Sequence, residues 1–424
     1  MKFKKTILKN GLRVVTVPMP DTQTATVVVM AGVGSRYETE KEAGLSHFIE
    51  HMFFKGTEKR PSALVISETL DSIGGEFNAV TLKDRTGYYA KVDCKHIDVA
   101  LDVIADIFLN SKIEAQEIER EKGTIIQELN MYEDDPRRNI GDVFERLLYV
   151  KNFLGRPIIG YKKTIQSFER RDFINYIRRF YTANNTIVCV AGKIDEKNIL
   201  HQVRKKFSLM NAGKKLSIWK NIEDQKYPAL KIKIKKTDQT HLILGNRAYH
   251  QNHKDRFVLA LLAIILGGNM SSRLFIEVRE RRGLAYAVST FIDSFRECGY
   301  LATQAGVDHG KLEETIKIIL REYKKIATEK VSVKELQKAK DYIKGKSLMG
   351  LEASDEVAVF HVDQELARNK IISEKEIFAR IDKITTKDIL RVARDIFRER
   401  TLNLAVIGPH RSRKKLQKIL TLAY

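Results

Sequence analysis

Two histidines and a glutamate lie close together near the start of the chain, in the order His47-Phe48-Ile49-Glu50-His51. Residues four apart lie on one face of a helix, so the imidazoles of His47 and His51 can reach the same metal ion. Glu50 lies beside them and can take a proton from a metal-bound water. This set suits zinc and inverts the H-E-x-x-H order of zinc peptidases. The alternative is two histidines spaced by accident on an amphipathic helix.

A catalytic zinc needs a third protein ligand, and residues 114–132 offer candidates for it. We expect this segment to be helical, with one face made of Glu114, Ile118, Glu121, Ile125, Glu128 and Tyr132. Carboxylates that alternate with isoleucines are unusual on a face meant for burial, so one glutamate is a candidate ligand and another its hydrogen-bond partner. Both can equally lie at the solvated edge of the helix. The spacing does not decide which glutamate would bind the metal.

The two halves of the chain resemble each other. FNAVT at 77–81 matches AYAVS at 285–289, and GYYAKV at 87–92 matches GYLATQ at 299–304. Each half also mixes strand-like runs with helical segments in the same order. A repeat of about two hundred residues is too long for a solenoid unit and indicates a duplicated domain. The predicted fold is α+β, with two homologous domains that each pack a mostly antiparallel sheet against helices.

The predicted domains are residues 1–209, with the candidate metal site, and residues 229–424, joined by a linker at 210–228. The second half contains no H-x-x-E-H, and the residue that matches Glu128 there is Lys346. We therefore expect one metal site per chain.

Composition excludes several classes of protein. With 43% hydrophobic residues the chain can build packed cores, and its longest apolar run is far shorter than the ~20 residues of a membrane-spanning helix. The net charge of +21 invites nucleic-acid binding, but the lysines are scattered, so no nucleic-acid partner is expected. Three cysteines without CxxC spacing and the absence of a signal-peptide pattern predict a cytoplasmic protein.

Five segments in order resemble the pitrilysin/insulinase family of inverzincins, which includes mitochondrial processing peptidase and its single-chain bacterial relatives. They are AGLSHFIEHMFFKGT (43–57), GGEFNAVTLKDRTGYY (74–89), EREKGTIIQELNMYEDDP (119–136), GRPIIG (155–160) and LGGNMSSRLFIEVRERRGLAYAV (266–288). The resemblance implies that His47, His51 and Glu128 bind one Zn²⁺ per chain. It also implies that Glu50 is the general base and Glu121 a catalytic carboxylate that supports the ligands.

The resemblance extends to substrate binding. Phe77, Asn78 and Ala79 would form an edge strand that pairs with an extended peptide. Arg279 and Tyr286 would bind the substrate and help to polarise the scissile carbonyl.

In the family, two two-domain halves close like a clamshell around a chamber, and this chain resembles one half. We therefore predict a zinc metalloendopeptidase that acts as a homodimer on peptides or unfolded segments, in which Arg279 and Tyr286 complete the partner's zinc site. The alternative is a non-catalytic structural or substrate-presenting subunit of a processing-peptidase-like complex.

Overall fold

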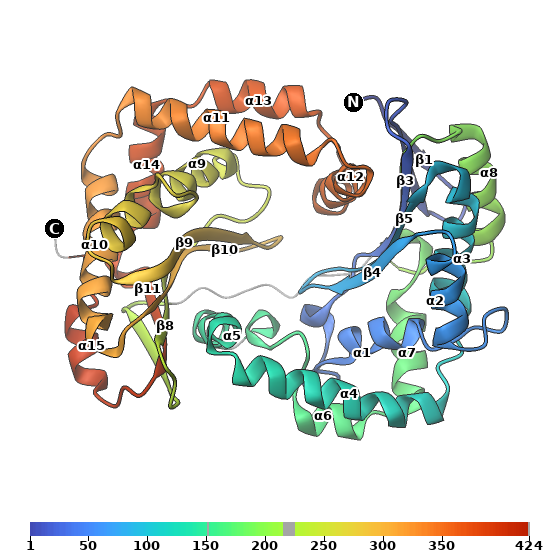
Figure 1. The fold of residues 1–424 in the computed structure, drawn as a ribbon, viewed down its shortest axis with the longest axis horizontal. Helices are drawn as coiled ribbons and strands as arrows, with labels where there is room; N and C mark the ends of the chain where they lie inside the picture. Colours follow the sequence, from blue (N-terminus) through green and yellow to red (C-terminus); the bar gives the residue numbers. More distant parts are fainter. Residues whose placement is uncertain (151, 215–224, 423–424) are drawn as a thin grey trace. The chain divides into compact units, whose positions relative to one another are not determined.

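The computed structural model describes residues 1–150, 152–214 and 225–422 and shows two compact units (Figure 1). The first unit comprises Met1–Asn130, Arg156–Trp219 and Leu348–Ile372, and the second comprises Met131–Gly155, Lys220–Ser347 and Ser373–Tyr424. Each unit packs one β-sheet against helices. The expected α+β fold is therefore confirmed. Residues 215–224 of the predicted linker lie outside the described residues.

The sheet of the first unit has the strand order β1-β2-β6-β3-β5-β4. Its strands are β1 (Lys4–Ile7), β2 (Arg13–Pro18), β3 (Thr24–Ala31), β4 (Glu76–Thr81), β5 (Thr86–Asp93) and β6 (Thr186–Gly192). Neighbouring strands are antiparallel except β2 and β6, which are parallel. The central strands β3 and β6 are rich in valine and almost fully buried, whereas β4 lies at the edge.

The α-helices of the first unit are α1 (Leu45–Phe53), α2 (Ala63–Asp71), α3 (Ile97–Asn110), α4 (Ala115–Asp134), α6 (Lys162–Ser167), α7 (Arg170–Phe180), α8 (Glu196–Phe207) and α12 (Ser354–Arg368). The candidate metal-binding residues lie on α1 and α4. The last four residues of α4 are assigned to the second unit. α3 covers one face of the sheet at β3 and β5, and α1 contacts β4 and β5.

The second unit has a sheet of order β7-β11-β8-β10-β9. Its strands are β7 (Ala229–Ile234), β8 (Thr240–Ala248), β9 (Ala285–Ser294), β10 (Gly299–Val307) and β11 (Leu402–Gly408). Its helices are α5 (Pro136–Leu148), α9 (Arg256–Gly267), a π-helix (Phe275–Glu280), α10 (Leu312–Thr328), α11 (Val333–Gly350), α13 (Glu374–Asp382), α14 (Thr386–Ile396) and α15 (Arg413–Ile419). α11 ends within the first unit.

The two sheets share a strand order, in agreement with the repeat in the sequence. The order β2-β6-β3-β5-β4 of the first sheet corresponds to β7-β11-β8-β10-β9 of the second, and each contains one parallel pair, β2 with β6 and β7 with β11. The segments 77–81 and 285–289, matched in sequence, lie in the edge strands β4 and β9. α4 and α11 likewise occupy corresponding places in the chain.

One helix of each half packs on the sheet of the other half. α5 follows α4 but packs on β11, β8 and β7, where Phe144 is fully buried and Glu145 accepts a hydrogen bond from the Tyr300 hydroxyl at 3.1 Å. α12 follows α11 but packs on β6, β3 and β2, where Val357 and Val362 are fully buried. Apolar residues of both helices complete the core on one face of each sheet.

Because α5 and α12 pack on the sheets of the opposite halves, the compact units differ from the two halves of the sequence. The boundaries predicted from the repeat, 1–209 and 229–424, follow the order of the sequence, whereas each compact unit includes a segment from the other half. The sequence repeat does not predict this exchange of helices. The apolar face of an amphipathic helix shows that the helix is buried against a sheet, but it does not show which sheet.

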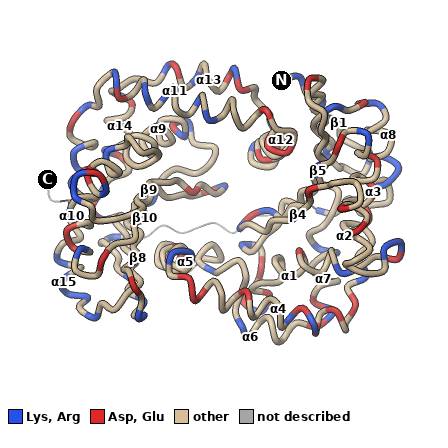
Figure 2. The backbone as a smooth tube through the Cα atoms, in the orientation of Figure 1, with Lys and Arg blue, Asp and Glu red and all other residues tan. Residues whose placement is uncertain are grey.

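Charge is spread over both units. Figure 2 shows Lys and Arg along many helices and loops, interspersed with Asp and Glu. In the part of the chain that the structure describes, no helix is both long enough and apolar enough to cross a membrane. Among the described residues, the three cysteines, Cys94, Cys189 and Cys298, form no disulfide.

The packing of α12 leads to a first prediction. Val362→Ala removes two buried methyl groups between α12 and the first sheet and should lower the free energy of unfolding by about 2 kcal/mol. Val359→Ala, on the same helix but 38% exposed, is the matched control and should change it by less than about 0.5 kcal/mol. Chemical denaturation measures both. Equal effects of the two substitutions would contradict the packing of α12 on this sheet.

Candidate metal centre

The start of α1 is fixed by backbone geometry and by a buried carboxylate. Gly44 has φ +98°, and a Cβ at this position would lie 2.6 Å from the carbonyl oxygen of Ile159. The Glu38 carboxylate accepts hydrogen bonds from the backbone N–H groups of Gly44 (2.8 Å) and Ser46 (2.7 Å). Burial raises the pKa of Glu38 to about 8, and these hydrogen bonds oppose the shift. The first turn of α1 is thus held in one place.

α1 separates an apolar face from a polar one. The buried residues are Leu45, Ser46, Phe48, Ile49, Met52 and Phe53. His47, Glu50 and His51 lie on the other face, and the ring centroids of the two histidines are 4.7 Å apart. The helix therefore turns both imidazoles to the same side, as the spacing predicts.

Glu128 of α4 lies against both histidines. Its Oε1 is 3.6 Å from Nε2 of His47, and its Oε2 is 3.5 Å from Nε2 of His51. One ligand atom from each of the three residues lies within 4.8 Å of the others. No second group of three or more His, Cys, Asp or Glu meets this criterion among residues 1–150, 152–214 and 225–422.

These distances fit zinc. With metal–ligand bonds of about 2.0–2.1 Å, neighbouring ligand atoms around a tetrahedral ion are about 3.4 Å apart. The separations of 3.5 and 3.6 Å are close to that value and longer than usual hydrogen bonds. Two neutral nitrogens and a carboxylate are a donor set typical of catalytic zinc. His47, His51 and Glu128 could therefore hold the metal and leave a fourth position open.

Glu121 connects α4 to α1. Its Oε1 lies 2.8 Å from Nδ1 of His51, and its Oε2 lies 2.5 Å from Nζ of Lys55. Burial acts to raise the pKa of Glu121, but the hydrogen bonds from His51 and Lys55 outweigh it and hold the pKa below its usual range. An ionised carboxylate can only accept, so Nδ1 of His51 donates to Glu121, and Nε2 is the ring nitrogen that faces Glu128.

Glu50 is held by the edge strand. Its Oε2 accepts a short hydrogen bond from the Thr81 hydroxyl at the end of β4. Thr81 is buried, and no other residue is hydrogen-bonded to the Glu50 side chain in the described part of the chain. The carboxylate is thus oriented through one oxygen, and its other oxygen is available to a second donor.

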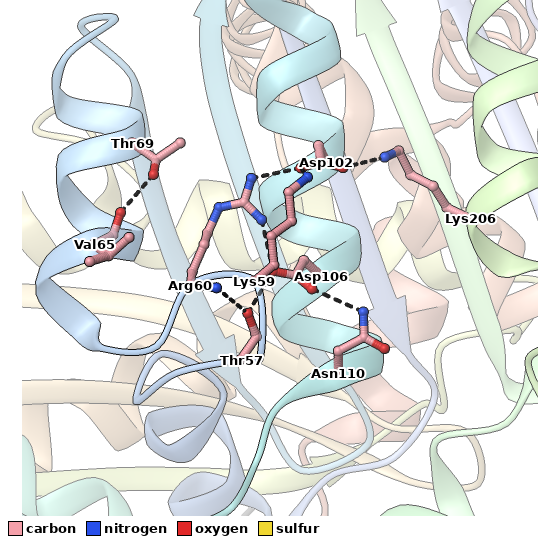
Figure 3. A network of polar contacts seen from close by, with 9 residues as sticks. All are labelled: Thr57, Lys59, Arg60, Val65, Thr69, Asp102, Asp106, Asn110 and Lys206. Carbon is pink, nitrogen blue, oxygen red and sulfur yellow. Dashed lines mark hydrogen bonds and ion pairs between the residues drawn. The ribbon is translucent and has the colours of Figure 1, made fainter.

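A polar network anchors the segment that follows α1 (Figure 3). Asp106 of α3 accepts hydrogen bonds from the Thr57 hydroxyl and the Arg60 guanidinium, both at 2.7 Å. Arg60 also contacts Asp102 at 2.6 Å, and Lys206 of α8 contacts the other oxygen of Asp102 at 2.5 Å. Burial acts to raise the pKa of Asp102, but Arg60, Lys206 and Lys59 together hold it well below its usual range. The C-terminal end of α1 is thereby tied to α3.

The residues predicted to bind substrate lie in an edge strand of the first sheet. Phe77, Asn78 and Ala79 belong to β4, which pairs only with β5 and so has one free edge in the first sheet. Asn78 is exposed, and Phe77 and Ala79 are half-buried on the alternate face. The Phe77 ring lies 6.2 Å from that of Phe54, just beyond α1.

Arg279 and Tyr286 lie together in the second unit. Nη1 of Arg279 donates a hydrogen bond to the Tyr286 carbonyl oxygen at 2.9 Å, and the guanidinium carbon lies 4.8 Å from the centre of the tyrosine ring. The two residues therefore contact each other in the second unit. The metal-binding residues belong to the first unit.

Comparison with known proteins identifies the family of this chain. Residues 13–162 match the Insulinase (Peptidase family M16) family, and residues 167–343 match the Peptidase M16 inactive domain. An uncharacterized zinc protease of Rickettsia felis is 38% identical over 415 residues, which cover 96% of this chain and 98% of the relative. The zinc protease YmxG of Bacillus subtilis is 34% identical, with 96% of this chain and 98% of the relative covered. The chain belongs to the insulinase family, peptidase family M16. It is a zinc metalloprotease, as the sequence predicts.

Two solved structures have a fold closely similar to that of this M16 chain. A protease from Helicobacter pylori has a TM-score of 0.89 at 24% identity and covers 96% of this chain and 100% of its own. A structure described as a peptidase M16 inactive domain from Pseudomonas fluorescens has a TM-score of 0.88 at 16% identity, with 97% and 99% covered. These likenesses support the two-unit fold.

Two residues at the metal centre of this M16 protein are missing from the sequence prediction. Lys55 lies just after α1 and is four residues from His51, a spacing that could have placed it beside the same carboxylate. Thr81 lies in the strand that sequence analysis predicts, but nothing in the sequence indicates that its hydroxyl reaches Glu50.

The contact between Glu121 and His51 leads to a second prediction. Glu121→Gln removes the charge that orients His51 and should weaken zinc binding by about 10- to 100-fold. Competition with a chromogenic chelator measures the zinc Kd. Glu117→Gln, on the same helix and paired with Arg120 at the surface, is the control and should leave the Kd unchanged. A Glu121→Gln protein with wild-type zinc affinity would refute this supporting role.

Proposed function

We propose that the protein is a zinc-dependent endopeptidase in which Glu50 activates the attacking water. The observation that carries the proposal is the convergence of His47, His51 and Glu128, with Glu50 on the same turn of α1. Glu128 is the third ligand because it faces Nε2 of both histidines, whereas Glu121 contacts the opposite nitrogen of His51. We assign one zinc to each chain.

His47, His51 and Glu128 would hold the zinc, which would supply a Lewis acid able to lower the pKa of a water molecule to about 7 and to polarise the scissile carbonyl. Glu50 takes one proton from the water as its oxygen bonds to the carbonyl carbon. Glu50 then gives that proton to the amide nitrogen as the C–N bond breaks, so the carboxylate is restored. Thr81 keeps the Glu50 carboxylate in one orientation during both proton transfers, because its hydroxyl donates a hydrogen bond to the Glu50 oxygen that does not take the proton.

The proposed substrate is a peptide or unfolded segment that adds a strand at the free edge of β4. Backbone groups of an extended chain pair with the Phe77–Ala79 edge, which recognises conformation rather than sequence. A folded protein offers few such free segments. An endopeptidase acting on unfolded segments therefore follows from the position of β4 beside α1.

Arg279 and Tyr286 are the proposed donors to the carbonyl oxygen of the substrate. Family members enclose substrates between two two-domain halves, and this chain corresponds to one half. We therefore propose a homodimer that closes around a chamber, with Arg279 and Tyr286 of one subunit completing the zinc site of its partner. The cytoplasmic location stays a prediction of the sequence.

The role of Glu50 gives a third prediction. Glu50→Gln keeps the size of the side chain but cannot accept the proton, so cleavage of a quenched fluorescent peptide library should fall by about 10³-fold or more. Bound zinc, measured by elemental analysis, should stay near that of the wild type. Glu68→Gln, an exposed glutamate of α2, should cleave normally. If the wild type binds zinc but cuts nothing, a structural or substrate-presenting role replaces the peptidase.

The homodimer gives a fourth prediction. Glu50→Gln and the double variant Arg279→Ala/Tyr286→Phe should each be inactive alone, whereas their mixture should regain about a quarter of wild-type activity. Half of the dimers in a random mixture are mixed, and each contains one site with every group intact. Size-exclusion chromatography with light scattering confirms the mass. A mixture that stays inactive despite subunit exchange would rule out the arrangement in trans.

A further inference from the structure

Arg279 lies in an unusual helical segment of the second unit. Residues Phe275–Glu280 form a π-helix, in which the N–H of Arg281 donates to the carbonyl of Ile276, five residues back, at 2.9 Å. Such π-helical turns are rare and are frequently found at functional sites. The π-helix therefore points to a constraint on the residues it presents.

Two aromatic rings enclose the Arg279 guanidinium. Its carbon lies 4.9 Å from the centre of the Phe275 ring and 4.8 Å from that of Tyr286. Phe275 is 8% exposed and Tyr286 is 79% exposed, so one ring belongs to the core and the other lies at the surface. Phe275 packs in the apolar core of the second unit, and it is the fixed member of the stack.

The chain reverses sharply to bring Tyr286 back to Arg279. Gly283 has φ +58°, a conformation that glycine adopts at little cost, and its N–H donates to the Arg279 carbonyl at 2.9 Å. The N–H of Leu284 donates to the Val278 carbonyl at 2.9 Å, and β9 begins at the next residue. Tyr286 is thus held by the start of β9 and accepts the Arg279 Nη1 hydrogen bond through its carbonyl.

Among the described residues, one carboxylate lies within 4.0 Å of the Arg279 guanidinium. Glu277, in the same π-helix, is paired with Arg281, with Arg282 at 2.6 Å and with Arg321 at 3.0 Å. The nearest carboxylate to Arg279 is that of Glu280, at 3.8 Å from Nε, and its side chain is largely exposed. The guanidinium therefore contacts two rings and one carbonyl oxygen closely and Glu280 more loosely, and its Nη2 makes no hydrogen bond within the described residues.

We propose that Phe275 is a positioning residue that orients Arg279 for the substrate carbonyl. This inference rests on the proposed function, in which Arg279 contacts the substrate. The ring of Phe275 restricts the arginine rotamers before the substrate binds, so less conformational freedom is lost in the transition state. Cation–π stacking of this strength corresponds to a change of about 3- to 10-fold in the population of the oriented guanidinium.

The test compares three ring substitutions in the full-length enzyme. Phe275→Leu removes the ring but keeps an apolar side chain, and it should lower kcat/KM by about fivefold through kcat. Phe275→Tyr keeps the ring and should stay within about twofold of the wild type. Phe257→Leu is the matched control, because Phe257 also lies under an arginine, with the Arg256 guanidinium 4.2 Å from its ring. Phe257→Leu should leave kcat/KM unchanged.

A spectroscopic readout follows the stack without any peptidase assay. In arginine-labelled protein, the Nε–H resonance of Arg279, assigned by its loss in Arg279→Gln, should be shifted by the ring currents of Phe275 and Tyr286. Phe275→Leu should move it toward the position of an unstacked arginine, whereas Phe275→Tyr and Phe257→Leu should not.

The possible failures are distinguishable. If Arg279→Gln lowers kcat/KM but Phe275→Leu leaves both kcat/KM and the Arg279 resonance at wild-type values, the positioning role of Phe275 is wrong while the role of Arg279 stands. If Arg279→Gln itself cleaves like the wild type, the proposed contact of Arg279 with substrate is wrong and the inference fails with it. Equal losses in Phe275→Leu and Phe257→Leu would mean general destabilisation and would also overturn it.

Discussion

The metal centre depends on one buried carboxylate, that of Glu121, which joins α1 to α4. A buried carboxylate is costly unless both oxygens are paired, and here His51 and Lys55 supply one donor each. α4 cannot shift along α1 without breaking one of these contacts. Glu128 lies seven residues further on, two helical turns, so the same contact sets its position against both histidines.

α4 begins among residues of the first unit and ends among residues of the second. It ends at Asp134, and α5 begins at Pro136, with the Asp135 side chain accepting the backbone N–H of Arg137. α5 then completes the core of the second sheet, just as α12 completes that of the first. Each sheet needs a helix from the other half of the sequence. Neither half of the sequence alone contains the whole core of one unit, which makes their stabilities interdependent.

The duplicated architecture presents different side chains beside its two edge strands. In the first unit, α1 lies beside the edge strand β4 and presents the histidines and Glu50. In the second unit, the π-helix contacts the edge strand β9 and presents Arg279 against Tyr286. The second unit has Lys346 where the repeat matches Glu128, and no metal-binding group is found among its described residues. The same strand order thus positions a candidate metal centre in one copy and a guanidinium in the other.

The sequence by itself determined the features that depend on short spacing. His47, Glu50 and His51 lie on one helical turn whatever surrounds them, and the alternation of strands and helices repeated in each half predicts both sheets. Only the tertiary structure decided which of Glu121 and Glu128 faces the histidine Nε2 atoms, because that depends on the register of two helices some seventy residues apart. It also decided that α5 and α12 cover each other's sheets. The apolar face of a helix predicts that the helix is buried, but it does not predict which surface covers it.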